Sequence, residues 1–130
     1  MKLVIVESPF MYQDDNEDLR AIGQLRNITY ARLALSDCLF RGEAPYASHL
    51  LLTQPFVLDD DDANERKLGI DAGLDWGDKA DASVFYTDLG ISTGMKYGKI
   101  RADKIKRPYE ERTIEGWENV LDESPKTTLV

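Results

Sequence analysis

The sequence predicts an α/β domain built on a parallel sheet, and three observations support this fold class. Residues 2–6 form a short apolar run that suits a strand covered on both faces. Pro9 ends this run, because proline has no N–H to give to a central ladder. Strand-like and helix-like segments then alternate, which favours right-handed crossovers between parallel strands. We expect three layers and four or five strands, with the first four in the order 2-1-3-4.

Composition limits the classes of function. The 130 residues carry a net charge of −8, which argues against duplex nucleic acid as a partner but leaves room for a single small nucleotide. Cys38 is the only cysteine, so no internal disulfide can form and a reducing, cytoplasmic location is expected. No apolar run is long enough to span a membrane. We expect one domain over residues 1–121 and a flexible tail over 122–130.

The first long helix is predicted over residues 16–40. Apolar residues recur there at helical spacing, and we expect this stripe to face the core: Leu19, Ile22, Leu25, Ile28 or Thr29, Leu33 and Leu39. Asp14, Asp15 and Asn16 are good N-cap types, and Gly42 is a typical stop. The simplest reason for Gly23 is close packing on the sheet.

The remaining elements follow in alternation. A second strand is predicted over residues 43–53, with Pro45 placing it at an edge. A helix with a Leu68, Ala72 and Trp76 stripe follows over 63–76. The other predicted elements are a strand over 80–88, a helix from 92 or 93 to 106, a strand over 107–114 and one helical turn over 115–121.

Two loops are expected to flank one crevice. Residues 7–15 and 87–95 leave the carboxyl ends of strands one and three, where α/β domains bind ligands. Gly90 and Gly94 permit close backbone approach, and Ser92 and Thr93 stand at a helix N-terminus that attracts anions such as phosphate. Ser92 could equally serve as a helix cap. The stretch lacks the lysine of a P-loop.

Several other side chains are candidates at this crevice. Glu7 and Asp88 could form a catalytic carboxylate pair, or be solvated loop acids. Tyr12 could stack on a base, as could Tyr86, although Tyr86 also fits the core edge. His49, the sole histidine, could contact substrate or carry a proton, or be structural.

Charged residues outside the crevice have simpler interpretations. Arg26 could reach a ligand phosphate or pair with surface acids. The aspartates at 59–62 lack the glycine and the terminal glutamate of a calcium loop and suit a solvated helix N-terminus. We therefore expect no metal and no cofactor.

A set of short motifs resembles a known family. The motifs are Ser8-Pro9-Phe10, Asn27 with Tyr30-Ala31-Arg32, Pro45 with Ser48-His49-Leu50, Asp60, Glu65-Arg66 with Gly69, and Gly90-Ile-Ser-Thr-Gly-Met95. Together they cover roughly residues 2–113. They resemble a branch of short domains from phages and bacteria within the nucleoside 2-deoxyribosyltransferase-like superfamily.

The resemblance implies a Rossmann-like or flavodoxin-like domain that binds a nucleoside or nucleotide, and a homo-oligomer of two or more copies. The ligand contacts that we expect are Ser8, Pro9, Phe10, Tyr12, Arg26, His49, Gly90, Ser92, Thr93, Gly94 and Met95. Active members of the superfamily cleave the N-glycosidic bond with a glutamate near the start of a helix. Lys96 and Tyr97 stand at the corresponding positions here, and neither supplies a carboxylate.

We consider three functions. Glu7 or Asp88 could replace the missing glutamate in a hydrolase or transferase acting on deoxynucleotides. The chain could instead be an inactive phage-type protein that sequesters a nucleotide signal or a cofactor fragment. As a third alternative, its acidic surface could dock on a protein partner.

Overall fold

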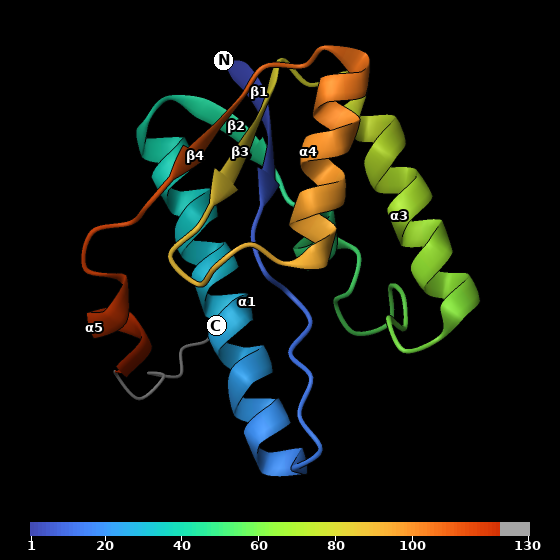
Figure 1. Cartoon of the computed structure of the whole chain (residues 1–130), viewed down its shortest axis with the longest axis vertical. Coiled ribbons are helices and arrows are strands. Elements are labelled where there is room, and N and C mark those ends of the chain that lie inside the picture. The colour runs from blue at the N-terminus through green and yellow to red at the C-terminus, as the bar shows by residue number, and fades with distance from the viewer. Residues whose placement is uncertain (123–130) are drawn as a thin grey trace.

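The computed structural model describes residues 1–122. Nine elements follow one another along this part of the chain (Figure 1): β1 (Lys2–Glu7), α1 (Glu17–Phe40), β2 (Glu43–Tyr46), α2 (Ser48–Leu51), α3 (Ala63–Gly77), β3 (Ala82–Tyr86), α4 (Thr93–Ile105), β4 (Tyr109–Arg112) and α5 (Trp117–Asp122). The predicted tail at 122–130 lies outside the described residues, apart from Asp122, which ends α5.

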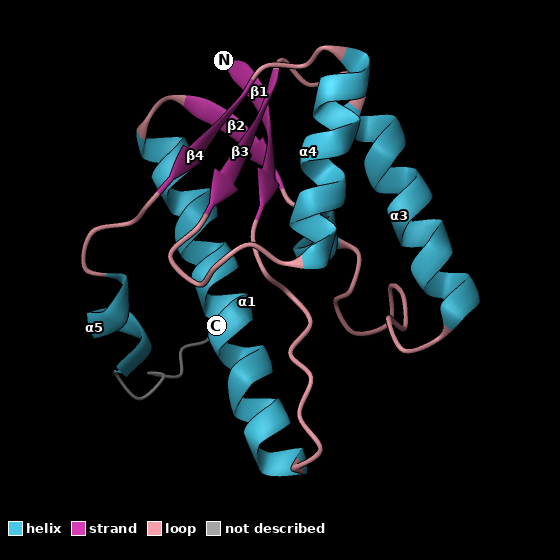
Figure 2. Cartoon of the chain, viewed as in Figure 1, coloured by secondary structure: helices cyan, strands magenta, loops and turns pink. Residues whose placement is uncertain are grey.

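The sheet has four parallel strands in the order β2-β1-β3-β4. Helices α1 and α5 lie on one face, and α3 and α4 lie on the other (Figure 2). The three-layer α/β architecture and the strand order are therefore confirmed, with four strands in the described residues. Within residues 1–122, no helix combines the length and the apolar character that a membrane crossing requires.

The ends of α1 follow the capping rules. The Asn16 side chain accepts a hydrogen bond from the Leu19 amide at 3.0 Å, which satisfies one of the free N–H groups of the first turn. Glu17 and Asp18 place negative charge at the positive end of the helix dipole. Gly42 follows the helix with a φ of +83°, a conformation that glycine adopts without strain.

The core lies between the sheet and a different face of α1 from the one predicted. Its main members are Val4, Val6 and Val84 from the strands with Tyr30, Ala34 and Cys38 from α1. The predicted stripe is wrong, since Leu19, Ile22, Leu25 and Leu39 are exposed. Helical spacing shows which residues share a face but not which face meets the sheet, and here small residues let the helix approach closely.

Helix α3 departs from expectation in the same way. Leu68 and Trp76 are exposed, and Gly77 is the buried residue of this helix, packed beside Ile5 and Arg107. Asp62 caps the helix by accepting hydrogen bonds from the Asn64 and Glu65 amides, so the aspartate run does serve as a helix N-terminus.

The second predicted strand was too long. Strand β2 ends at Tyr46, and residues 48–51 form the short helix α2 instead. A short apolar run such as Leu50 to Leu52 fits a strand or a helix equally well, so its periodicity could not decide between them. His49 therefore lies on α2 rather than at the end of a strand. The predicted edge position of β2 is confirmed.

Gly23 also has a different neighbour from the one expected. A Cβ at this position would overlap the ring of Tyr12, which belongs to the loop before α1. The glycine therefore admits the loop, not the sheet.

Candidate functional site

The loops after β1 and β3 leave the same edge of the sheet. These strands are parallel neighbours, with Val6 paired to Val84 and Glu7 paired to Phe85. The loop from Ser8 runs beside the N-terminal half of α1, and the loop from Thr87 leads into α4 (Figure 1). The carboxyl ends of β1 and β3 and the start of α4 therefore meet at one place, the usual location of ligands in this architecture.

Glu7 is the acidic side chain on the α4 side of this place. It ends β1 and lies against α4, where a Cβ on Gly98 would overlap its Oε2 atom and would lie 3.3 Å from Phe85. Burial raises the pKa of the Glu7 carboxyl to about 7, and the nearby positive charge of Arg107 opposes part of that rise. Glu7 therefore titrates near neutral pH, as a general acid or base requires.

Arg107 is fixed close to this carboxyl group. Its Nε donates to Ser83 Oγ at 2.8 Å, and its NH1 donates to the Gly77 carbonyl oxygen at 2.6 Å. These bonds hold a cation on the α4 side of the sheet. Neither Arg107 nor Gly98 was among the predicted site residues. A glycine four residues after Gly94, inside a predicted helix, was the available signal for Gly98.

The N-terminus of α4 lies one turn away from Gly98. Ser92 Oγ accepts a hydrogen bond from the Met95 amide at 3.2 Å, so Ser92 does cap the helix. The amides of Thr93 and Gly94 have no partner within the helix, and both residues are exposed. Met95 is buried, and Gly90 has a φ of +94°. The α4 N-terminus thus combines exposed amides with a positive dipole end.

Ser8, Phe10 and His49 form a group that fixes the β1–α1 loop. Ser8 Oγ and His49 Nε2 are 3.0 Å apart, and the rings of Phe10 and His49 meet edge to face at 5.4 Å. The Phe10 carbonyl oxygen accepts from Asn27 Nδ2 at 2.9 Å. Ser8 and Pro9 are buried. The group joins the loop to both α2 and α1.

His49 is neutral in this setting. Burial lowers the pKa of its imidazole to about 4, because the charged form loses its hydration. A group with so low a pKa carries few protons near neutral pH, so the hydrogen bond to Ser8 accounts for His49 better than proton transfer does.

Asp88 lies in a different environment from Glu7. Its Oδ2 accepts from the Tyr30 hydroxyl and from the Ile114 amide, both at 2.8 Å. These partners lie on the α1 side of the sheet, whereas Glu7 lies on the α4 side. The structure therefore does not join the two carboxylates as a pair, and Asp88 holds α1 to the segment after β4.

The two candidate tyrosines also differ. Tyr86 is buried and donates to Asp37 Oδ2 at 2.6 Å. It is therefore a core residue, and not a side chain available to stack on a base. Tyr12 packs on Gly23, and the Arg26 guanidinium lies 5.4 Å from the centre of its ring. Tyr12 and Arg26 therefore belong to the N-terminal half of α1 and its covering loop.

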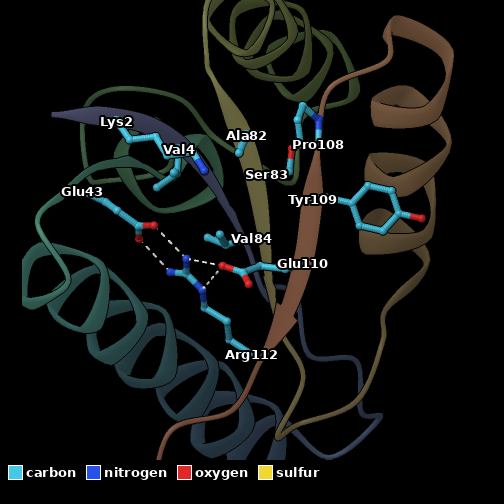
Figure 3. A pocket seen from close by; sticks show the side chains of 10 residues that line it. All are labelled: Lys2, Val4, Glu43, Ala82, Ser83, Val84, Pro108, Tyr109, Glu110 and Arg112. Carbon is cyan, nitrogen blue, oxygen red and sulfur yellow. Dashed lines mark hydrogen bonds and ion pairs between the residues drawn. The ribbon is translucent and has the colours of Figure 1, made fainter.

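A separate hollow of about 220 Å³ lies over the strands (Figure 3). Arg112 points into it and donates to both carboxylate oxygens of Glu43 at 2.7 Å. Lys2, Val4 and Glu110 also line it. No predicted site residue is among its lining residues. The charge of Arg112 is already paired with Glu43. We therefore interpret this hollow as the surroundings of a structural ion pair and not as the predicted crevice.

Metal-ligating residues do not gather in the described part of the chain. Over residues 1–122, no three His, Cys, Asp or Glu side chains lie together in a way that would hold a metal ion.

Residues 2–112 match a protein family described as a domain of unknown function, DUF7768. The chain belongs to this family. A solved structure similar to this DUF7768 domain is the 2-deoxyribosyltransferase of Bacillus psychrosaccharolyticus, with a TM-score of 0.57 and 16% sequence identity. The match covers 94% of this chain and 92% of the transferase chain. At this identity the likeness establishes a shared fold. No curated protein matches the DUF7768 domain significantly.

Proposed function

We propose that this DUF7768 domain binds a deoxynucleoside 5′-phosphate and cleaves its N-glycosidic bond, with Glu7 as the catalytic carboxylate. The observation that carries the proposal is the position of Glu7. It lies at the carboxyl end of β1, presses against Gly98 of α4, and has a pKa near 7. The fold shared with a 2-deoxyribosyltransferase supports the choice of substrate class.

The proposed phosphate position is the N-terminus of α4. The Thr93 and Gly94 amides and the helix dipole would hold a 5′-phosphate there. Gly94 and Gly98 are one turn apart, about 6 Å along the helix axis. This separation resembles that between the 5′-phosphate and the anomeric carbon of a nucleotide. A nucleotide anchored at Gly94 would therefore bring C1′ close to the Glu7 carboxylate.

The proposed reaction has two steps. An ionised Glu7 oxygen attacks C1′ as the C1′–N bond breaks, and the base leaves with a proton from water. Water or a second base then displaces Glu7 from C1′, which regenerates the carboxylate. Arg107 would keep enough of Glu7 ionised near neutral pH for the first step, because it opposes the effect of burial on the Glu7 pKa.

Release of free base tests the proposal. The protein is incubated with a panel of deoxynucleoside 5′-monophosphates and the matching deoxynucleosides, and base is measured by chromatography. We expect release from the monophosphates, its loss in Glu7→Gln, and its retention in Asp88→Asn. Release that is equal in wild type and Glu7→Gln would remove Glu7 from the mechanism.

Asp88 favours a second candidate function, a binding protein without catalysis. Its Oδ2 is bonded to Tyr30 and Ile114, so it is not placed to protonate a leaving base beside Glu7. Such a protein would keep the α4 phosphate position and sequester a nucleotide. Thermal shift together with the base-release assay separates the two functions, since a ligand at 100 times its dissociation constant adds about 2.7 kcal/mol of stability. Stabilisation without base release supports the binder. The absence of both stabilisation and base release contradicts both functions.

A further inference from the structure

Helix α4 and the residues that end it carry a concentration of positive charge in an otherwise acidic chain. Residues 96–107 contain six lysine and arginine residues and one aspartate, although the whole chain has a net charge of −8. The helix covers the sheet on the side away from α1 (Figure 2). Part of this positive charge is turned away from the sheet, toward solvent.

Four residues form the solvent-facing side of the helix, which we call the α4 outer face: Lys96, Tyr97, Ile100 and Lys104. Met95 and Ala102, two turns apart, are buried on the sheet side. Helical spacing places the outer face opposite them. The Tyr97 side chain is 67% exposed and the Ile100 side chain 61% exposed. The face is about 12 Å long from the first lysine to the second.

The acids beside the outer face are neutralised by other cations of the same helix. On one side Lys99 pairs with Glu111 of β4, and on the other Arg101 Nη2 lies 2.7 Å from Asp78 Oδ1. Asp103 is the single acidic residue of α4. The two flanking ion pairs reduce the repulsion that an anion approaching this face would otherwise meet.

The lysines of the outer face have no such partners. Neither Lys96 nor Lys104 forms an ion pair among the described residues. Lys104 lies in the last turn, where a cation favours the helix dipole. Lys96 is the fourth residue of the helix, close to the positive end of the dipole, where a cation is unfavourable. Helix stability therefore does not account for Lys96.

An exposed aromatic ring between two free cations indicates which anion fits this face. Proteins that bind single-stranded nucleic acid combine cations along the backbone with aromatic side chains on which bases stack. Tyr97 stacks on no other ring in the described part of the chain, so its ring is free to take a base. A duplex holds its bases within its own stack, and a run of carboxylates offers no base.

We propose that the α4 outer face binds single-stranded nucleic acid. Lys96 and Lys104 contact phosphates of the strand, and the ring of Tyr97 stacks on a base between them. This ligand is separate from the mononucleotide of the proposed function. The inference therefore does not rest on cleavage at Glu7.

The first experiment is fluorescence anisotropy of a labelled oligothymidylate of about 12 nucleotides, titrated with the full chain. We expect a dissociation constant between about 1 and 100 μM at low salt, and an affinity that falls as salt rises. Lys96→Gln and Lys104→Gln should each weaken binding and reduce the slope of log affinity against log salt by about 0.7, the contribution of one phosphate. Wild type that shows no salt-dependent binding overturns the inference.

Lys67→Gln is the matched control. Lys67 is an exposed lysine on α3 and is paired with Asp71. This variant should bind the oligonucleotide as wild type does. Weakening by Lys67→Gln as large as that by Lys96→Gln would show attraction that is spread over the molecule, and would overturn the assigned face.

Substitution of the aromatic ring tests stacking. Tyr97→Ala should weaken binding at least about fivefold and leave the salt slope unchanged, because stacking releases no counterions. Tyr97→Phe should bind like wild type, since it keeps the ring. An alanine variant that binds as tightly as wild type contradicts a base at this position and overturns the single-strand assignment.

Competition tests the class of ligand. The duplex of this strand with its complement, and polyglutamate of similar length, should each displace the labelled strand less well than the unlabelled strand does. Polyglutamate that competes equally would assign the face to an acidic protein, and an equally effective duplex would exclude stacking; either result overturns the inference. Glu7→Gln should bind the oligonucleotide as wild type does, so a failure of base release and a failure of strand binding are separate results.

Discussion

The carboxylate of Glu7 fills the space beside Gly98 that a side chain on α4 would otherwise take. A strand residue thus delivers an acid to the surface of a helix, and the helix makes room by having glycine there. Glu7 is half-buried beside the helix, and this burial raises the pKa of its carboxyl to about 7.

The stability of the protein should fall as pH rises from about 4.5 to 7. Folded protein keeps the Glu7 proton up to about pH 7, whereas the unfolded chain loses it near the ordinary value of 4.5, so the folded state binds more protons in this range. Glu7→Gln should remove this contribution and stabilise the protein at pH 8 by up to about 3 kcal/mol. Urea unfolding at pH 5 and pH 8 measures the effect. Glu115→Gln, at an exposed position, should leave the pH dependence of wild type.

The effect of Gly98→Ala should depend on Glu7. In wild type the new Cβ meets the carboxylate, and we expect a loss of about 1 to 3 kcal/mol. In a Glu7→Ala background the Phe85 ring is the close neighbour that remains, 3.3 Å from the new Cβ, so the loss caused by Gly98→Ala should become smaller. A double-mutant cycle by chemical denaturation gives the coupling. Additive effects would show that the two residues do not share this space.

Asp88 should behave as a structural acid. Asp88→Ala leaves the Tyr30 hydroxyl and the Ile114 amide without their acceptor, which should cost about 2 to 4 kcal/mol. Any base-releasing activity per folded molecule should remain, the opposite of the result expected for Glu7→Gln. Denaturation and activity measured on the same samples make the comparison. Loss of activity at full stability would return Asp88 to the catalytic candidates.

The Arg112–Glu43 pair should be costly to break from one side. Arg112→Met leaves the Glu43 carboxylate buried without its partner, and we expect a loss of about 3 to 5 kcal/mol. The double variant Arg112→Met/Glu43→Leu should recover most of it. Arg101→Met removes a more exposed pair with Asp78 and should cost no more than about 1 kcal/mol. Chemical denaturation of the three variants, each compared with wild type, measures these losses. A double variant as unstable as Arg112→Met would show that the guanidinium has other essential partners.

Local signals were sufficient for most elements. Asn16, Gly42, Asp62 and Ser92 act at helix ends as their residue types suggest, because capping depends on hydrogen bonds within a few residues. The alternation of strands and helices predicted the parallel sheet, because a helix that follows one strand returns the chain to the end of the sheet where that strand began. The next strand then runs parallel to the first. The short apolar run after Pro45 was the exception, because its length suited either structure.

The candidate site was predicted less completely. Glu7 and the start of α4 were singled out from their places at strand ends and at a helix start. Gly98 and Arg107 were not, because the importance of Gly98 comes from packing against Glu7 and that of Arg107 from the effect of its charge on the Glu7 carboxyl. Asp88 and Glu7 looked alike in the sequence, and their different partners separate them.

Helix ends and the placement of loops followed from the sequence, since each depends on neighbours along the chain, and the alternation of strands and helices favoured the observed strand order. Which side of α1 meets the sheet, and which acid is left with a pKa near 7, came from packing between distant segments. Tyr30 and Ala34 face the core while Ile22 faces solvent, although all share the same helical periodicity. Burial is a property of the assembled layers, and a one-dimensional pattern does not carry it.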